Sequence, residues 1–342
     1  MKALVYEGPH QMPIREVPAC TPKAGQVKIK VKYCGICGSD LHGYTGASGR
    51  KIPPMIMGHE FSGVVTELGE GVKKFKVGDR VAVQPVEYCG ECEFCRNGSV
   101  NVCANRRGLG VLDVNGAFTE SICVNEKFVY GLADNVSDEE GALLEPLSVA
   151  YHAVGHAKPI EGRNVLIAGT GTIGLLVLML VKANHPAKIV VTDLSDDRLA
   201  MARRFGADIT VNPAQQDLDQ VLRDAGLRDN IHVAIECVGA TPTCQQTVDF
   251  VKIQGRIIWV GNAAKMVNIN MQNIVTRELS IQGVYAFTEE DFAGALKMLE
   301  EKRIPAKEIV SRIVPLEETT ETFEELVKGA SRDIKVLVDV NG

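Results

Sequence analysis

The stretch Asn164-Val165-Leu166-Ile167-Ala168-Gly169-Thr170-Gly171-Thr172-Ile173-Gly174 decides the fold of the second half of the chain. Its first five residues predict a buried strand, and the residues from Ile173 to Val181 predict an apolar helix. Between them, Gly-x-Gly-x-x-Gly gives a tight turn, a backbone that can approach a pyrophosphate and a close helix-to-strand contact. The helix N-terminus would face the phosphates. This stretch predicts a dinucleotide site whose candidate residues are Gly169, Gly171, Thr172, Ile173 and Gly174.

A carboxylate follows at the expected spacing. Asp193 comes after the predicted strand 188–192, 19 residues beyond Gly174, and a spacing of ~20 suits a group that accepts from the ribose 2′-hydroxyl. Because a 2′-phosphate would place a like charge against Asp193, we expect NAD rather than NADP. Arg198 could pair with a phosphate, but its place at the start of an amphipathic helix favours a solvated or adenine-facing role.

Two patterns of elements divide the chain. Short strands separated by glycine fill the first 130 residues and predict a β-rich barrel or sandwich. From residue 163, strands alternate with helices, which predicts a doubly wound parallel sheet. Its expected strands are 164–168, 188–192, 208–211, 232–236, 255–260 and 278–283. We expect a dinucleotide-binding domain over 151–286 and a first domain over 1–150, which the strand-like tail 335–340 rejoins.

Composition excludes several classes of function. The chain has 342 residues, 45% apolar and 23% charged, with a net charge of −6 and no block of like charge that could follow a polyphosphate. The longest apolar run is about half of the ~20 residues that a membrane span needs. No secretion signal is visible at the start. We therefore expect a cytoplasmic protein that binds neither nucleic acid nor membrane.

Four of the ten cysteines form a compact motif. Ten cysteines are too sparse for a disulfide scaffold in a chain of this size, and the spacing C-x2-C-x2-C-x7-C predicts a metal site instead. Bacterial ferredoxins place the fourth cysteine after three residues and follow it with proline, so zinc is favoured over an iron–sulfur cluster. A shell of four thiolates has no open position, which makes this zinc structural. The ligands would be Cys89, Cys92, Cys95 and Cys103.

A second set of ligands is dispersed along the chain. Cys37, His59, Glu60 and Glu145 would give a catalytic zinc its sulfur, nitrogen and oxygen donors. Spacing alone does not decide this. Taken singly, a cysteine is more often a small buried apolar residue and a histidine a hydrogen-bonded structural one.

At this point the chain resembles a known family. The motifs Cys37-Gly38-Ser39-Asp40, Gly58-His59-Glu60 and Glu145-Pro146, together with the four-cysteine lobe and the glycine run, occur in the order seen in zinc-dependent medium-chain alcohol dehydrogenases. The likeness is strongest to their polyol branch and covers essentially the whole chain. It implies a Rossmann domain and a GroES-like catalytic domain, residues 1–150 completed by 287–342, with an active site in the cleft.

The resemblance also implies residue roles. Cys37 and His59 would be zinc ligands, with Glu60 or Glu145 as the carboxylate, bound directly or through water. Ser39 would hydrogen-bond the substrate hydroxyl, and His42 would pass its proton outward. The expected cofactors are one catalytic zinc, one structural zinc and NAD. Cys34, His152 and His156 are expected to pack or to face solvent.

The substrate is less closely defined. The short segment between Gly38 and Gly58 favours a small polar alcohol and its ketone, and the resemblance points to polyols, diols, alditol phosphates or sugar acids. Ala286 and Phe287 stand where sorbitol dehydrogenase has an Arg-Tyr pair, which argues against sorbitol. A phosphorylated substrate would need a cation near the site. The candidates are Arg50, Lys51 and Arg277.

Other functions stay open. A threonine or simple alcohol dehydrogenase is an alternative within the family, and a non-catalytic, crystallin-like nucleotide-binding protein is another. Zinc-free reductases of this fold lack the cysteine and histidine pattern. We also expect a homo-dimer or homo-tetramer, because the apolar strand 255–261 with Trp259 could pair with its copy. The alternative for that strand is an internal position.

Overall fold

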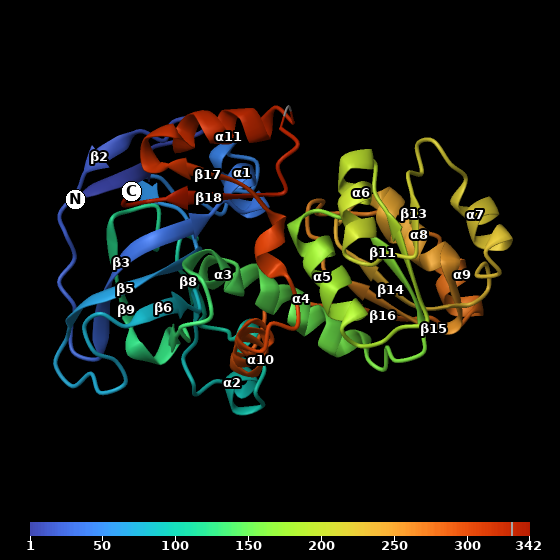
Figure 1. Ribbon diagram of the computed structural model, residues 1–342, viewed down its shortest axis with the longest axis horizontal. Coiled ribbons are helices and arrows are strands. Elements are labelled where there is room, and N and C mark those ends of the chain that lie inside the picture. The colour runs from blue at the N-terminus through green and yellow to red at the C-terminus, as the bar shows by residue number, and fades with distance from the viewer. Residues whose placement is uncertain (330) are drawn as a thin grey trace. The chain divides into compact units, whose positions relative to one another are not determined.

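The computed structural model describes residues 1–329 and 331–342, and this chain divides into two compact units (Figure 1). Unit 1 consists of Met1–Glu145, Leu296–Lys302 and Ala306–Gly342, and unit 2 of Pro146–Ala295 and Arg303–Pro305. Both chain ends therefore belong to unit 1. The domain boundaries at 150/151 and 286/287 stay predictions. Among the described residues, no helix combines the length and apolarity needed to cross a bilayer.

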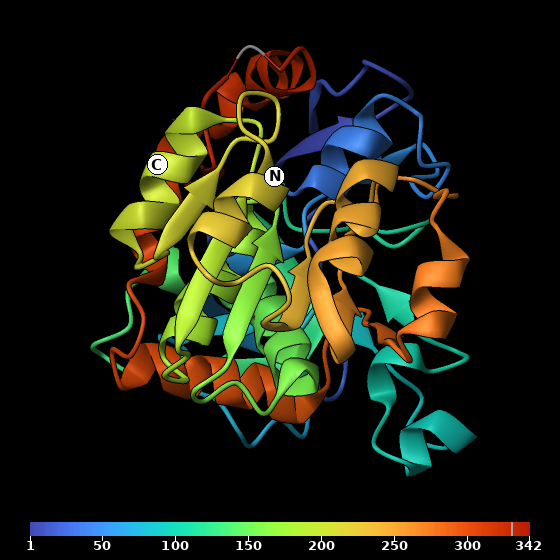
Figure 2. The ribbon, with the colours of Figure 1, turned by 90° about the vertical axis from the view of Figure 1, so that its right-hand side faces the viewer.

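The predicted doubly wound sheet is present in unit 2 (Figure 2). Six parallel strands lie in the order β13-β12-β11-β14-β15-β16, with helices on either side of them. The strands are β11 (Asn164–Ala168), β12 (Lys188–Thr192), β13 (Ile209–Val211), β14 (Ile231–Glu236), β15 (Val251–Trp259) and β16 (Ser280–Gly283). The helices along this part of the chain are α4 (Leu144–Ala157), α5 (Thr172–Lys182), α6 (Asp196–Arg204), α7 (Leu218–Asp224), α8 (Thr241–Phe250), α9 (Met271–Thr276) and α10 (Glu289–Glu300).

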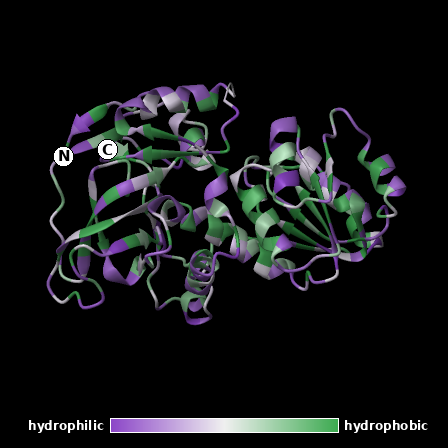
Figure 3. Ribbon diagram, viewed as in Figure 1, coloured by the Kyte–Doolittle hydropathy of each residue, from purple (hydrophilic) through white to green (hydrophobic). Residues whose placement is uncertain are grey.

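The strands of unit 2 are apolar because both faces of a parallel sheet are covered (Figure 3). All five residues of β11 are buried, and eight of the eleven residues of α5 are buried as well. Leu166, Val190, Ala234 and Ile257, from four different strands, belong to one core cluster. This core supports the glycine run at the carboxyl end of β11.

The position of strand β15 corrects one prediction. It lies between β14 and β16, with Trp259 opposite Glu236 on one side and Gly283 on the other. Both edges of β15 are therefore hydrogen-bonded to strands of the same chain. The prediction that this strand pairs with its copy in a second chain is wrong. The strand also starts four residues earlier than predicted. Gln254 takes a positive φ of 57° just before Gly255, so the strand continues through an irregular register.

Unit 1 is rich in β-structure. Its largest sheet has seven strands in the order β10-β6-β5-β3-β18-β17, with β9 also paired to β3. These are β3 (Gln26–Gly35), β5 (Glu60–Leu68), β6 (Arg80–Val83), β9 (Ser121–Asn125), β10 (Val129–Gly131), β17 (Val310–Pro315) and β18 (Lys335–Asp339). The smaller sheets contain β1 (Lys2–Tyr6), β2 (Ile14–Glu16), β4 (Met55–Ile56), β7 (Val86–Glu87) and β8 (Arg107–Gly108). The helices are α1 (Gly38–Tyr44), α2 (Glu93–Arg96), α3 (Asp138–Ala142) and α11 (Thr319–Val327).

The C-terminal tail joins the N-terminal sheet, as the sequence predicts. β18 runs antiparallel to β3, with Leu337 opposite Gly35 and Asp339 opposite Tyr33. On its other side β18 pairs with β17 in parallel. The tail therefore places its first residue, Lys335, beside the end of β3 that leads into α1.

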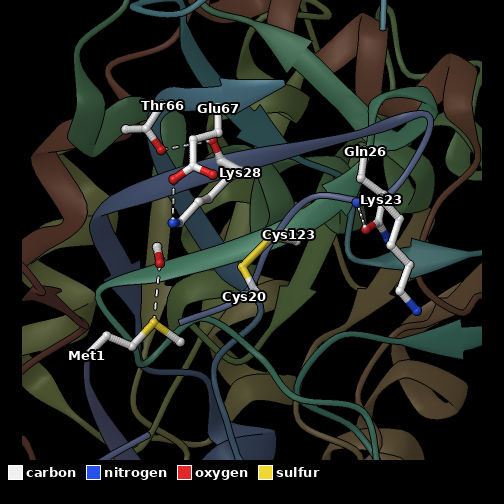
Figure 4. Close-up of a disulfide and its surroundings, with 9 residues drawn as sticks. Met1, Cys20, Lys23, Gln26, Lys28, Thr66, Glu67 and Cys123 are labelled. Carbon is white, nitrogen blue, oxygen red and sulfur yellow. Dashed lines mark hydrogen bonds and ion pairs between the residues drawn. A yellow bond between two sulfur atoms is a disulfide. The ribbon is translucent and has the colours of Figure 1, made fainter. Parts of the chain in front are cut away.

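One disulfide crosses unit 1 (Figure 4). It joins Cys20, in the segment before β3, to Cys123 in β9, with the two Cα atoms 6.1 Å apart and 103 residues between them in sequence. The sequence gives no local signal for this pairing. The other eight cysteines are free thiols.

Candidate metal centres and dinucleotide site

Two adjacent strand ends bring the dispersed ligands together. β3 and β5 are antiparallel neighbours, with Gly35 opposite Glu60. Cys37 therefore follows the end of β3 at the place where His59 and Glu60 lead into β5. Cys37 is also the N-cap of α1, which fixes its backbone in an extended conformation.

Cys37, His59 and Glu60 form one group in the structure. One potential ligand atom from each residue lies within 4.8 Å of the others. His59 and Glu60 are buried, whereas Cys37 is partly exposed. A thiolate, an imidazole and a carboxylate suit zinc, and three protein ligands leave a coordination position open. The donor set therefore fits a catalytic zinc.

Glu145 has a separate position in the first turn of α4. Among the described residues, it is not part of the group of mutually close ligand atoms. Burial raises the pKa of Glu145 to about 7, against the opposing effect of the His59 charge and with a further rise from Glu60. Glu145 therefore belongs to the same electrostatic environment as the group.

A lysine from the C-terminal tail contacts Glu60. Lys335 of β18 forms an ion pair with the Glu60 carboxylate and donates a hydrogen bond to the Ile36 carbonyl at 3.0 Å. Both side chains of the pair are 2% exposed. Lys335 is not recognisable from local sequence, because 275 residues separate it from Glu60 and its position depends on the pairing of β18 with β3.

A second buried ion pair lies behind His59. Lys51 Nζ donates to Asp40 Oδ1 at 2.7 Å, and this same oxygen is 3.6 Å from His59 Nδ1. Asp40 is fully buried, and its Oδ2 accepts from the Cys37 backbone N–H at 3.2 Å. The prediction that Lys51 could bind a substrate phosphate is wrong, because its charge is buried against Asp40. The position of Asp40, three residues after the N-cap Cys37, is the sequence signal that could have predicted its contact with the Cys37 backbone.

Ser39 and His42 lie on α1, three residues apart, and both are exposed. Residues at this spacing share one face of a helix. This placement is compatible with a proton path along α1, and their roles stay predictions. Cys34 is fully buried in the core of unit 1, as expected.

The four cysteines of the lobe form the second group. Their Sγ atoms are 3.5 to 3.9 Å apart in four of the pairs. Four sulfurs bound tetrahedrally at 2.3 Å would be about 3.8 Å apart, so the group fits zinc without rearrangement. Hydrogen bonds from backbone N–H groups, first that of Cys95, lower the pKa of Cys92 to about 6. Such donors stabilise the thiolates that a metal requires.

The glycine run has the geometry of a dinucleotide turn. Gly169 has a φ of +93°, which favours glycine, and a Cβ at Gly174 would overlap the Gly169 carbonyl. A Cβ at Gly171, the N-cap of α5, would meet nothing within 4 Å. Gly174 therefore serves close packing, and the open side of Gly171 is free for a phosphate.

Asp193 is held beside this turn. Its Oδ2 accepts from the backbone N–H and the hydroxyl of Thr170, at 2.7 and 2.8 Å, and its Oδ1 accepts from the Ser195 backbone N–H at 2.9 Å. Arg198 lies in the first turn of α6 and donates its backbone N–H to the Ser195 hydroxyl at 3.4 Å. The structure brings the carboxylate to the glycine run, as the spacing predicts.

Three other predicted residues have structural partners in unit 2. His152 Nδ1 is 2.7 Å from the Asp291 carboxylate, and His156 Nδ1 is 2.9 Å from the Gln282 amide, so both pack as expected. Arg277 donates to the Val248 carbonyl and to a second backbone carbonyl. The Arg277 guanidinium is thus hydrogen-bonded to backbone carbonyls at the end of α8. The prediction of Arg277 as a candidate phosphate-binding residue is therefore wrong.

Comparison with known proteins identifies the class. Residues 23–134 match the alcohol dehydrogenase GroES-like domain, and residues 172–301 match the zinc-binding dehydrogenase family. The chain belongs to the zinc-dependent medium-chain alcohol dehydrogenases.

Similarity to curated relatives places the chain in the polyol branch of this family. The chain is 35% identical to sorbitol dehydrogenase of Halalkalibacterium halodurans over 344 residues, which cover 99% of each chain. It is 33% identical to D-arabitol-phosphate dehydrogenase of Enterococcus avium over 348 residues, which cover 100% of this chain and 98% of the relative.

Solved structures with the same fold contain dinucleotides. An alcohol dehydrogenase of Escherichia coli CFT073 complexed with NADH superposes with a TM-score of 0.91 at 31% identity. A zinc-binding dehydrogenase of Sinorhizobium meliloti 1021 bound to NADP gives 0.93 at 28% identity. Each comparison covers 99% of both chains. The fold is therefore that of NAD(P)-binding dehydrogenases.

Proposed function

We propose that the chain is a zinc- and NAD-dependent dehydrogenase. It interconverts a secondary alcohol of a small polyol, diol, alditol phosphate or sugar acid with the corresponding ketone. The observation that carries the proposal is the group Cys37, His59 and Glu60, whose ligand atoms lie within 4.8 Å of one another. This donor set with an open position is typical of a catalytic zinc, whereas the four-cysteine lobe suits a structural one.

Each group at the site would have a separate role in the reaction. Zinc supplies a Lewis acid that acidifies the substrate hydroxyl, and NAD accepts the hydride. Cys37, His59 and either Glu60 or Glu145 would hold the metal. Ser39 would accept a hydrogen bond from the substrate hydroxyl and relay its proton, through the ribose of the dinucleotide, to His42, which would pass it outward. Both side chains are exposed.

The dinucleotide binds unit 2 in this proposal. Its pyrophosphate would contact the glycine run and the N-terminus of the 11-residue helix α5, where unpaired backbone N–H groups favour an anion. Asp193 accepts from the ribose 2′-hydroxyl, and Arg198 lies beside the adenosine portion. The preference for NAD rests on the Asp193 charge, which a 2′-phosphate would have to face.

Two observations bear on the substrate. Phe287 is fully buried and packs on Phe292 at a ring-centroid distance of 5.5 Å, so it has no free surface for a substrate. The absence of an Arg-Tyr pair at Ala286 and Phe287 is what supports a substrate other than sorbitol. Lys51 and Arg277 are excluded as phosphate-binding groups, and exposed Arg50 is the candidate that stays.

A substrate panel tests the function. Polyols, alditol phosphates, short diols, sugar acids, threonine and simple alcohols would be oxidised at alkaline pH with NAD and, separately, with NADP. We expect NADH formation with one of the first four classes. Turnover of threonine or a simple alcohol alone would favour the alternative dehydrogenases. NADH binding without turnover of any substrate would favour a crystallin-like protein.

We also propose a homo-dimer or homo-tetramer that works in the cytoplasm. Because β15 is internal, the end strands of the sheet in unit 2 are β13 and β16, among the strands that the structure describes. Light scattering of the purified chain would distinguish monomer, dimer and tetramer.

A further inference from the structure

Lys51 occupies a position built for a single buried cation. Its side chain is 2% exposed, and its Nζ donates to Asp40 and to the Gly110 carbonyl. Its aliphatic stem crosses α1 at Gly43, where a Cβ would overlap the Lys51 Cγ atom. Backbone hydrogen bonds between the neighbours of Lys51 and Leu112 hold the segment in place. Burying an ammonium group is costly, so this arrangement requires the Asp40 charge.

Asp40 connects that cation to two of the proposed metal ligands. One carboxylate oxygen accepts from the Cys37 backbone N–H, and the other is 3.6 Å from His59 Nδ1. His59 Nδ1 is buried and has no hydrogen-bond partner within residues 1–329 and 331–342. Asp40 Oδ1 is therefore the acceptor available to it, and a small movement would complete the bond.

The position of Asp40 depends on Lys51. The Asp40 carboxylate is fully buried, and the Lys51 ammonium, 2.7 Å from its Oδ1, is the cation that forms an ion pair with it. A displaced Asp40 would hold neither the Cys37 turn nor the His59 ring in place. A carboxylate that accepts from a metal-binding histidine fixes the ring and its tautomer.

We propose that Lys51 is a positioning residue for the metal centre. By pairing with Asp40, it holds the carboxylate that caps Cys37 and faces His59, and so determines how firmly these two residues retain zinc. This inference rests on the proposed function, which assigns both residues as ligands. Lys51 contacts neither ligand in this account and acts only through Asp40.

The test measures zinc release from the holoprotein to a chromogenic chelator. Lys51→Met removes the charge and keeps the stem, and Lys51→Arg keeps the charge. Loss of such supporting groups typically costs 10- to 100-fold in metal affinity, so we expect one zinc per chain to leave Lys51→Met at least about tenfold faster. The other zinc, in the four-cysteine lobe, should leave at the unchanged rate. Lys51→Arg should restore most of the retention. Lys2→Met is the control, because it removes an exposed ion pair with Glu317 in the same unit.

A double variant keeps the test decisive even if Lys51→Met alone fails to fold. Lys51→Met leaves Asp40 buried without its partner, which can unfold the chain, whereas Asp40→Asn with Lys51→Met removes both charges. Because Lys51 acts through Asp40, the double variant should release zinc at the same rate as Asp40→Asn alone. Gly43→Ala, which displaces the lysine stem without removing a charged group, should also speed release.

Two results would overturn the proposal. The first is a folded Lys51→Met protein that retains both zinc ions as the parent does. The second is a double variant that releases zinc several-fold faster than Asp40→Asn, which would show that Lys51 acts by another route. If the parent chain itself binds one zinc only, in the lobe, the proposed function fails at its metal centre rather than at Lys51.

Discussion

At the scale of single residues, the charges around the proposed metal centre are arranged in buried pairs. Lys335 faces Glu60 and Lys51 faces Asp40, and in each pair both side chains are almost fully inaccessible. Removing one member of such a pair leaves an uncompensated charge, which commonly costs 3–5 kcal/mol. The proposed metal centre thus has two cations beside the carboxylates that surround Cys37 and His59.

Cys37 is the proposed ligand whose loss should be least tolerated. We expect Cys37→Ala to reduce turnover by about a thousandfold or more, since the Lewis acid lowers the barrier by several kcal/mol. NAD binding should change little, because the glycine run and Asp193 are in unit 2. Steady-state rates and NADH fluorescence titration measure the two effects. Cys244→Ser, a buried cysteine of unit 2, controls for loss of a thiol. Full activity in Cys37→Ala would remove this residue from the chemistry.

Asp193 should set the choice of dinucleotide. We expect Asp193→Gly to raise the ratio of kcat/KM for NADP to that for NAD by about tenfold or more, because the repulsion of a 2′-phosphate is lost. Absolute NAD affinity should fall as well, since Thr170 and Ser195 lose their acceptor. Asp208→Asn is the control for charge loss in the same unit. A parent enzyme that already prefers NADPH would contradict this role.

At the scale of elements, the turn from β11 to α5 combines packing and binding in separate glycines. Gly174 is close to the Gly169 carbonyl, whereas Gly171 has open space around its missing side chain. Under the proposed function, the same glycine motif contains one residue that the fold needs, Gly174, and one that would leave room for the ligand, Gly171.

This difference gives a matched pair of variants. Gly174→Ala should lower the free energy of unfolding by about 1–3 kcal/mol, because the methyl group has to displace backbone. Gly171→Ala should leave unfolding nearly unchanged, yet weaken NAD binding about tenfold or more by blocking the approach of the pyrophosphate. Urea denaturation and fluorescence titration separate the two outcomes. Equal losses of stability in both variants would refute the division of roles.

Local sequence patterns were sufficient to predict these elements. Contacts that depend on the pairing of strands far apart in the chain could not be predicted from such patterns. The apolar run before Gly169 and the spacing to Asp193 predicted β11, α5 and the carboxylate position. Lys335 could not be predicted, because its place beside Glu60 depends on strands at opposite ends of the chain. Lys51 was wrongly predicted as a candidate phosphate-binding residue because lysine side chains are exposed in most proteins. Its ion-pair partner Asp40 is on a different element, α1, so its burial could not be predicted locally.

At the scale of the whole molecule, unit 1 is closed by contacts far apart in sequence. β18 brings the C-terminal residues to β3, and the Cys20–Cys123 bond ties the N-terminal segment to β9. These links make the metal centre dependent on both chain ends. Unit 2 is built from one nearly continuous stretch, and its sheet order follows from local βα repeats.

The disulfide should contribute measurably to stability. Its loop is 103 residues long, and a native bond of this kind typically contributes about 2–4 kcal/mol. We expect the double variant Cys20→Ala with Cys123→Ala to unfold at lower denaturant concentration by that amount, with its zinc content unchanged. Mass spectrometry of non-reduced peptides from the parent should find the bond. Equal stability of parent and variant, or free thiols at both positions, would show that the bond does not form.

Anomalous scattering from crystals of the chain, recorded on both sides of the zinc absorption edge, tests the central claim most directly. Two zinc peaks per chain are expected. One should be surrounded by Cys89, Cys92, Cys95 and Cys103, and the other should lie at bonding distance from both Cys37 Sγ and a ring nitrogen of His59. Crystals of an active preparation with no peak between Cys37 and His59 would contradict the account.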